Sequence, residues 1–228
     1  MQRRNFLKTG LIGCSVSLLP YLLHAQSKTK LPNVLLIGDS ISLGYTKFVQ
    51  EMLEGKANVQ HALNPKGGAE NCAGTTNGLK NIDRWLSGTK WDVIHFNFGL
   101  HDLKHVDPVT GINSEKAEDP QQADLKTYEK NLTVIVSKLI ATKAILIFAT
   151  TTPFPDKPNG PLRSADQAEK YNNAALKIME KNKILINDLY SFTLPRMKEL
   201  QLPKNVHFSN EGSKIIAKQV VEKILSVI

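Results

Sequence analysis

Ser40 is the first residue of this sequence whose chemistry and position together suggest a reaction. It follows a run of four apolar residues, 34–37, and the short link Gly38-Asp39. An apolar run of this length, bounded by Pro32 and Gly38, predicts a strand buried on both faces of a parallel sheet. Open α/β sheets place their chemistry just past the carboxyl ends of such strands. A serine there can be a nucleophile for acyl transfer, although Gly-Asp-Ser is also an ordinary turn sequence.

Three later segments give this serine a context. They are Gly74, the run Phe98-Gly99-Leu100-His101-Asp102, and Val206-His207-Phe208. With the stretch from Gly38 to Gly44, they stand in the order of the four blocks of the SGNH (GDSL-type) hydrolases. The sequence therefore resembles this family from about Val34 to its end. The resemblance implies a serine esterase with a flavodoxin-like fold.

The resemblance also implies roles for individual residues. Ser40 matches the family's nucleophile, and His207 matches the base that takes the serine proton. The oxyanion hole of the family combines the backbone N–H of the serine, the backbone N–H of a glycine in the second block, and an asparagine side chain. Gly74 fits the second block best. Three other glycines remain alternatives for that position: Gly67, Gly68 and Gly78.

The third block departs from the family pattern at one position. His101 stands where an asparagine is usual, between Leu100 and Asp102. A neutral imidazole can still donate one N–H bond to an oxyanion, so we expect His101 to take over that role. Asn71 and Asn97 are the alternative amide donors.

A second departure concerns the acid that normally orients the histidine. The family usually carries an aspartate three residues before the base, and Lys204 occupies that position here. We predict that Asn205 orients the ring of His207 through its amide oxygen, without contributing a charge. A main-chain carbonyl, leaving a Ser–His dyad, and Asp102 are the alternatives.

Apolar periodicity divides the rest of the chain into alternating strands and helices. Strands are predicted at 34–37, 58–63, 91–98, 144–150 and 183–187, and helices at 45–53, 79–86, 125–139, 165–182, 189–200 and after Ser209. This alternation predicts a three-layer α/β/α sandwich around a five-stranded parallel sheet. Two long polar connections, 104–124 and 151–163, are expected to line the substrate site.

The first 25 residues are typical of a twin-arginine export signal. Arg3 and Arg4 precede an apolar run, 11–23, which is too short and interrupted to be a good membrane span. Ala25 is a suitable cleavage point, so we predict a signal at 1–25 and a single hydrolase domain at 26–228. The segment ending at Cys14 also resembles a lipoprotein box. A lipid anchor there would leave apolar residues on the mature side, so it is the secondary interpretation.

Charge and cysteine content limit the classes of partner and cofactor that the protein is expected to bind. Removing the signal takes away three basic residues and no acidic one, which lowers the net charge from +8 to +5. The remaining basic residues are scattered, which argues against nucleic acid as a partner. Cys72 is the one cysteine of the mature chain, so no intrachain disulfide can form. No metal-ligand cluster, phosphate loop or dinucleotide fingerprint is visible in the sequence, and we predict no cofactor and no metal.

These observations predict an exported esterase, periplasmic or secreted, that deacylates carbohydrates and in particular removes acetyl groups. Its partner would be a small-molecule or glycan ester, with membrane contact only during export. One alternative is a lipid esterase or thioesterase. Another is a non-catalytic glycan-binding protein on the same fold, which the lysine at position 204 favours and the intact Ser40 and His207 oppose.

Overall fold

Five short segments pair side by side in one fully parallel sheet. In the computed structural model, which describes residues 30–228, the strands are β1 (Asn33–Ile37), β2 (Asn58–His61), β3 (Val93–Phe96), β4 (Ile145–Ala149) and β5 (Leu185–Asn187). Their order is β2-β1-β3-β4-β5, with every neighbouring pair parallel. This is the flavodoxin-like order. From β1 the chain adds β2 on one side of the sheet and β3, β4 and β5 on the other, so the switch point lies between β1 and β3. The predicted sandwich and its sheet are confirmed. The predicted signal at 1–25 and Cys14 lie outside the described residues.

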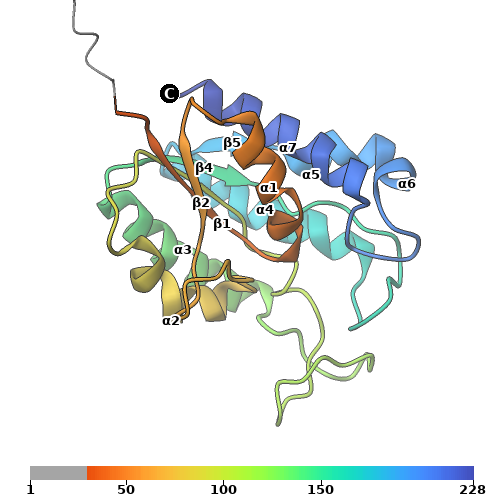
Figure 1. Cartoon of the computed structure of the whole chain (residues 1–228). Helices are drawn as coiled ribbons and strands as arrows, with labels where there is room; N and C mark the ends of the chain where they lie inside the picture. The colour runs from red at the N-terminus through yellow and green to blue at the C-terminus, as the bar shows by residue number, and fades with distance from the viewer. Residues whose placement is uncertain (1–29) are drawn as a thin grey trace, which may run out of the picture. The chain divides into compact units, whose positions relative to one another are not determined.

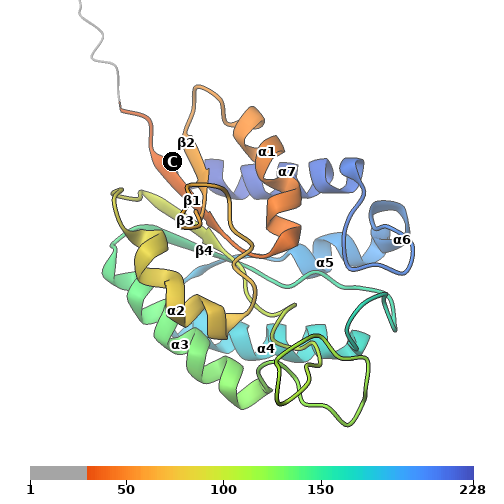
Figure 2. The ribbon, with the colours of Figure 1, turned by 60° about the horizontal axis from the view of Figure 1, so that its bottom comes forward.

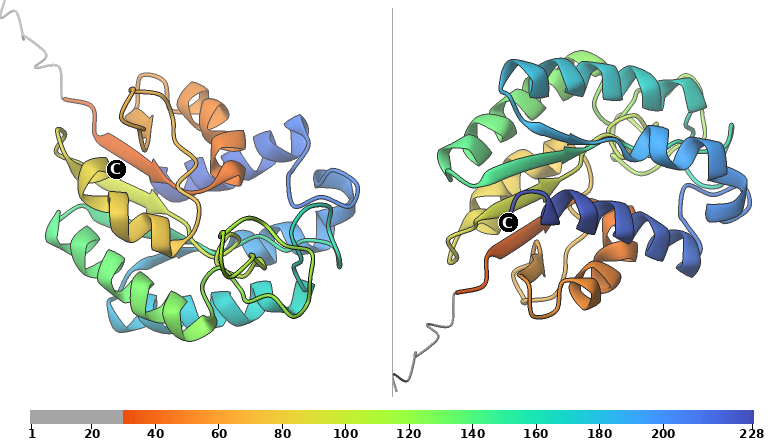
Figure 3. Two further views of the ribbon diagram at one scale, coloured as in Figure 1. Left: turned by 90° about the horizontal axis from the view of Figure 1, so that it is seen from below. Right: turned by 90° about the horizontal axis from the view of Figure 1, so that it is seen from above.

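Helices cover both faces of this sheet (Figure 1). They are α1 (Ser40–Met52), α2 (Thr75–Leu86), α3 (Leu125–Ala141), α4 (Ala165–Lys181), α5 (Leu189–Thr193), the 3-10 turn η1 (Leu194–Arg196), α6 (Met197–Leu200) and α7 (Asn210–Leu225). Helices α1 and α7 pack together on one face, and α2, α3 and α4 lie on the other (Figure 3). None of the helices within residues 30–228 has the length and apolarity needed to cross a membrane.

The alternation of side chains along β1 builds the two halves of the core. Val34 and Leu36 belong to the cluster under α1 and α7, whereas Leu35 and Ile37 belong to the cluster under α2, α3 and α4. All four side chains are essentially inaccessible to water. Burial on both faces is the reason that this strand is a continuous apolar run instead of an alternating one.

Three helices differ from the sequence-based expectation, and one of them, α2, begins at Thr75, four residues before the predicted start at position 79. Helix α1 begins at Ser40, five residues earlier than predicted, because the Asp39 carboxylate accepts a hydrogen bond from the Ile41 N–H at 2.9 Å and caps the helix. The helix predicted for 189–200 is interrupted by η1, which contains Pro195. Proline cannot donate the backbone hydrogen bond that a continuous helix requires. Ser209, by contrast, caps α7 as predicted, by accepting from the Gly212 N–H at 3.0 Å.

The connection between β3 and α3 projects from the carboxyl edge of the sheet (Figures 1 and 2). Isolated β-bridges between His105 and Gln121 and between Val106 and Asn113 hold its outgoing and returning segments together. Its outer turn exposes Val109 and Ile112. The predicted long connection is therefore an ordered arm that stands beside the edge where β1 and β3 end.

Candidate active site

Ser40 is presented to this edge by a tight turn between β1 and α1. A Cβ atom on Gly38 would lie 2.7 Å from the Ser42 Oγ, so no side chain fits at the exit of the strand. Asp39 then caps the helix, which leaves Ser40 as its first residue. Backbone N–H groups in the first turn of a helix have no acceptor within the helix. The turn therefore presents the Ser40 hydroxyl together with the Ser40 N–H, which has no acceptor within residues 30–228.

The structure brings the predicted nucleophile and base together. The Oγ of Ser40 lies 2.8 Å from the Nε2 of His207, across 167 residues of sequence. On the other side of the ring, the Nδ1 of His207 lies 2.8 Å from the Oδ1 of Asn205. The chain Ser40–His207–Asn205 is thus continuous. The ring of His207 is exposed, and Ser40 is half-buried.

A backbone contact settles which atoms carry the protons in this chain. The main-chain N–H of His207 donates to the same Oδ1 of Asn205, at 3.0 Å. A backbone N–H can only donate, so the amide atom that faces the ring is the oxygen. The Nδ1 of His207 must then carry the proton and donate it to Asn205. Consequently Nε2 is the unprotonated nitrogen, which is the form needed to accept the hydroxyl proton of Ser40.

Lys204, at the position of the usual aspartate, takes no part in this contact. Its side chain is exposed, its φ is 50°, and its carbonyl accepts from the Asn159 N–H. Asp102 is not the partner of His207 either, because its Oδ1 accepts two bonds from Thr75, from the backbone N–H at 2.8 Å and from the hydroxyl at 2.5 Å. Of the three groups considered for orienting the ring, Asn205 is the one that contacts it.

Gly74 lies in the loop that the structure ties to the serine turn. The Cys72 N–H donates to the Gly38 carbonyl at 3.0 Å, and a Cβ on Gly74 would lie 3.0 Å from the Asp102 carboxylate. The Gly74 N–H has no acceptor within residues 30–228. The N–H groups of the three alternative glycines are all engaged: Gly67 with the Asn64 carbonyl, Gly68 with the Asn64 side chain, and Gly78 with the Gly74 carbonyl.

Asp102 anchors the loop of Gly74 from beneath. It is fully buried, and burial raises the pKa of this carboxyl to about 7. Thr75, which bonds to it, also receives a contact from the Asn131 amide at 3.3 Å on α3. The second and third blocks are therefore joined by a buried polar network, which holds the N-terminus of α2 against the end of β3.

His101 lies between Leu100 and Asp102, just past the carboxyl end of β3. Burial above all, and then the cations Lys104 and Arg163, lower the pKa of His101 to about 3, and His207 adds to this effect. The imidazole is consequently neutral and carries one N–H. It donates to no group within the described residues. Of the two alternative donors, Asn97 already gives its amide to the Ala149 carbonyl at 2.7 Å, and Asn71 is exposed.

Two cations beside the site were not predicted from the sequence. Arg163 ends the proline-rich connection after β4, and its Nε donates to the Leu100 carbonyl at 3.2 Å. Lys104 lies two residues after the third block and is half-buried. A single arginine at the end of a proline-rich segment gives no sequence signal of its own, because its burial depends on how two distant loops meet.

His207 responds to this environment. Burial, followed by the positive charge of Arg163, lowers its pKa below the ordinary value of 6.5. The ring therefore stays neutral at neutral pH, with an unprotonated Nε2 that can act as the base. In residues 30–228 no group of three or more histidine, cysteine, aspartate or glutamate side chains could hold a metal ion.

Comparison with known proteins gives one match in sequence. A family model described as the GDSL-like lipase/acylhydrolase family matches residues 36–215. No protein with a curated description matches the chain.

Solved structures extend the comparison to the fold. A lipase/acylhydrolase from Enterococcus faecalis is 19% identical, with a TM-score of 0.66 over 86% of this chain and 96% of that chain. An acetyl xylan esterase, AlAXEase, is 17% identical, with a TM-score of 0.65 over 84% of this chain and 99% of that chain. A variant of an acetyl-xylooligosaccharide esterase from Geobacillus is 15% identical, with a TM-score of 0.62 over 85% of this chain and 94% of that chain. At these identities the likeness establishes a shared fold.

Proposed function

The chain belongs to the GDSL-like lipase/acylhydrolase family, whose members hydrolyse esters, and we propose that it is an exported serine esterase that deacetylates carbohydrates. The observation that carries this proposal is the hydrogen-bonded chain Ser40–His207–Asn205, with bonds of 2.8 Å on both sides of the ring. It combines a nucleophile, a base in the required tautomer and a group that fixes that tautomer.

In the proposed mechanism, the Oγ of Ser40 attacks the ester carbonyl carbon while its proton passes to the Nε2 of His207. The carbonyl oxygen becomes negatively charged and accepts from three donors: the backbone N–H groups of Ser40 and Gly74 and the ring N–H of His101. Collapse of this intermediate breaks the bond to the alcohol, which receives the proton from His207. The acyl group is then an ester of Ser40.

Deacylation repeats these steps with water. His207 removes a proton from the water, whose oxygen attacks the acyl carbon, and the same donors stabilise the second oxyanion. The proton returns to the Oγ of Ser40 as the carboxylic acid leaves. The Nδ1 proton stays on His207 and donates to the Oδ1 of Asn205 throughout, so that an amide dipole supports the imidazolium in place of a carboxylate charge.

The choice of sugar esters has two supports. Two of the similar structures are described as an acetyl xylan esterase and an acetyl-xylooligosaccharide esterase, which is a statement about those proteins. In this chain, His207 is exposed, so the side of Ser40 that faces this ring is open to solvent and leaves room for a bulky alcohol such as a sugar.

Export is proposed from the paired arginines at the beginning of the chain. We expect that replacing Arg3 and Arg4 by lysine retains the protein in the cytoplasm, as judged by fractionation of cells that express the full chain. Cys14→Ala serves as the matched control for a lipid anchor and should leave the fractionation unchanged. Loss of export in the Cys14 variant would favour lipidation instead.

Release of acetate from acetylated xylan and hydrolysis of 4-nitrophenyl esters of increasing chain length test the enzymatic proposal. We expect acetate release, with activity falling as the acyl chain lengthens, and loss of both activities in Ser40→Ala. Activity confined to long-chain esters would favour a lipid esterase, and preference for thioesters would favour a thioesterase. The absence of hydrolysis of all these esters by the folded protein would contradict the proposal.

A further inference from the structure

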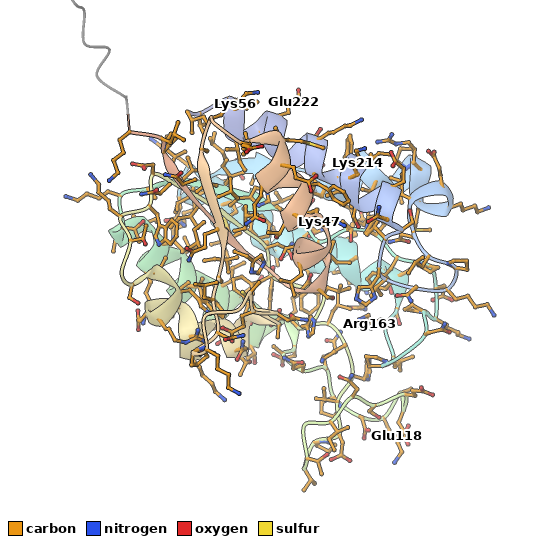
Figure 4. The ribbon with its side chains drawn as sticks, viewed as in Figure 1. Lys47, Lys56, Glu118, Arg163, Lys214 and Glu222 are labelled. Carbon is orange, nitrogen blue, oxygen red and sulfur yellow. The ribbon has the colours of Figure 1, made fainter. Side chains whose placement is uncertain are left out.

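Arg163 is buried beside the reacting groups. Only 6% of its surface is exposed. The backbone bond from the His105 N–H to the Leu162 carbonyl, at 3.0 Å, ties its segment to the base of the projecting arm. Figure 4 shows Arg163 where this arm joins the rest of the domain. Because its Nε bonds to Leu100, the guanidinium lies next to the third block and His101.

Most of the hydrogen-bonding capacity of this guanidinium is unused. Of its five N–H donors, the one on Nε is engaged with the Leu100 carbonyl. The terminal nitrogens donate to no group within residues 30–228, and no carboxylate there lies within 4.0 Å of them. These terminal nitrogens are not fully enclosed, so water can reach them. An arginine that is otherwise buried thus points a free fork of donors at accessible space.

Lys104 adds a second positive charge at the same place. It directly precedes His105, whose N–H bonds to the residue before Arg163. Its side chain is half-buried, and its amino group has no partner within the described residues. Desolvation, and then the charge of Arg163, lower the pKa of Lys104, as expected for two neighbouring cations.

The nearby acids offset these cations only in part. Asp39 and Asp102 are both buried and bonded to donors of their own, the Ile41 N–H and Thr75. Burial raises their pKa values to about 6 and about 7, so at neutral pH Asp39 keeps most of its charge and Asp102 only about half. A net positive charge beside His207 opposes formation of the imidazolium during catalysis. A bound anion would remove this opposition.

We propose that Arg163 and Lys104 form a subsite that binds a carboxylate carried by the ester substrate. The fork of an arginine matches the two coplanar oxygens of a carboxylate, and the lysine contributes a point charge. The preferred substrates are then acylated acids, such as acylated uronic acid sugars, in preference to neutral sugar esters. This inference rests on the proposed esterase function and specifies its substrate class.

Matched pairs of anionic and neutral esters test this subsite. An O-acetylated methyl hexuronoside is compared with its neutral uronamide, and 4-nitrophenyl hydrogen glutarate with its methyl ester. The first pair places the carboxylate on the alcohol side and the second on the acyl side. We expect the wild type to prefer the anionic member of at least one pair by about 10-fold or more in kcat/KM. The preference should weaken at high salt.

Single substitutions identify the residues that cause the preference for anionic esters. Arg163→Gln should reduce the anionic-to-neutral ratio by about 10- to 100-fold, and Arg163→Lys and Lys104→Gln should reduce it less. Lys56→Gln removes the same charge from an exposed position at the far end of the domain and should keep the ratio (Figure 4). If Arg163→Gln does not fold, as judged by circular dichroism, Arg163→Lys and Lys104→Gln decide.

Two results would overturn the subsite. One is equal hydrolysis of both members of each pair by the wild type. The other is an equal loss on neutral and anionic esters in Arg163→Gln, which would indicate that Arg163 contacts the oxyanion. If the wild type does not hydrolyse even 4-nitrophenyl acetate, the proposed function fails separately. Calorimetric titration with a methyl hexuronoside and its uronamide then tests the subsite, and equal binding of the two would overturn it.

Discussion

Within residues 30–228, two serines that are two positions apart in sequence each pair with a histidine, at nearly identical Oγ–Nε2 distances. Ser40 lies 2.8 Å from the Nε2 of His207, and Ser42 lies 2.7 Å from the Nε2 of His61. The first pair is at the surface, with His207 exposed. In the second pair, both side chains are buried at 2% exposure. A hydroxyl beside an imidazole is therefore not by itself a catalytic arrangement.

The two pairs also differ in the other contacts of the ring. The Oγ of Ser42 lies 2.8 Å from the Asp39 carbonyl, which can only accept. The Nδ1 of His61 lies 3.2 Å from the Ala62 carbonyl, so no group within residues 30–228 fixes the tautomer of His61 as Asn205 fixes that of His207. In the surface pair, the Oδ1 of Asn205 accepts a hydrogen bond from the Nδ1–H of His207, so the Nε2 of His207 accepts from Ser40. The buried pair locks the first turn of α1, and the surface pair is poised to remove a proton.

Replacing each serine in turn should separate the pairs most strongly. We expect Ser40→Ala to lower kcat by about 10⁴-fold or more, because nothing replaces the nucleophile. Ser42→Ala should retain most of kcat but reduce the free energy of unfolding by about 1–3 kcal/mol, because His61 and the Asp39 carbonyl each lose a partner. Ester hydrolysis and urea denaturation measure the two effects. Equal loss of activity in both variants would contradict the distinction.

His101 provides the next largest contrast, because only the surface pair faces a candidate oxyanion donor. His101→Ala should lower kcat by about 100- to 1,000-fold with little change in KM, since the bond strengthens only in the transition state. His101→Asn should recover much of this loss, because an amide also donates. Steady-state kinetics on 4-nitrophenyl acetate check both variants. A fully active His101→Ala enzyme would exclude this residue and return attention to Asn71.

Asn205 tests whether the orientation of the ring matters. Asn205→Ala removes the acceptor for the Nδ1 proton, so we expect kcat to fall by about 10- to 100-fold, equivalent to one hydrogen bond. Asn205→Asp should retain or raise kcat, because a carboxylate also stabilises the imidazolium. Lys204→Asp is the control and should leave kcat unchanged, because position 204 does not contact the ring. Full activity of Asn205→Ala would show that another group holds His207.

The pH dependence gives the smallest expected effect. Because burial and Arg163 lower the pKa of His207, the ring stays unprotonated to a lower pH, and the acid limb of kcat/KM should lie below pH 6.5. Arg163→Gln should move the His207 titration to higher pH, and Asn205→Asp should do the same. NMR titration of the His207 ring separates it from His101, whose pKa is about 3. A ring that titrates above pH 6.5 in the wild type would contradict this account.

The sequence was sufficient for the fold because local and global signals agree. Short apolar runs bounded by proline and glycine, alternating with amphipathic helices, predicted a parallel sheet covered on both faces, whereas the strand order came from the family resemblance. The start of α1 was missed because residues 40–44 include Gly44 and two serines, which form helices poorly. The interrupted helix at Pro195 was missed because apolar spacing continued across the proline.

The site was predictable where residue type follows from chemistry and unpredictable where it depends on loop packing. Ser40 and His207 could be named because their blocks are distinctive. Asn205 could be proposed only as one of three groups, because a two-residue turn places it against the ring. Arg163 was missed because its position depends on contacts between two long connections, which no local pattern encodes.

Covalent labelling with a fluorophosphonate, followed by peptide mapping of the mature protein, shows directly whether Ser40 is the nucleophile. The probe reacts with a serine only when a base and oxyanion donors activate it. Ser40 and Ser42 lie two residues apart, so fragmentation of the labelled peptide distinguishes them. The account predicts stoichiometric label on Ser40 and none on Ser42. Label on Ser42, or a folded protein that takes no label and hydrolyses no ester, would contradict it.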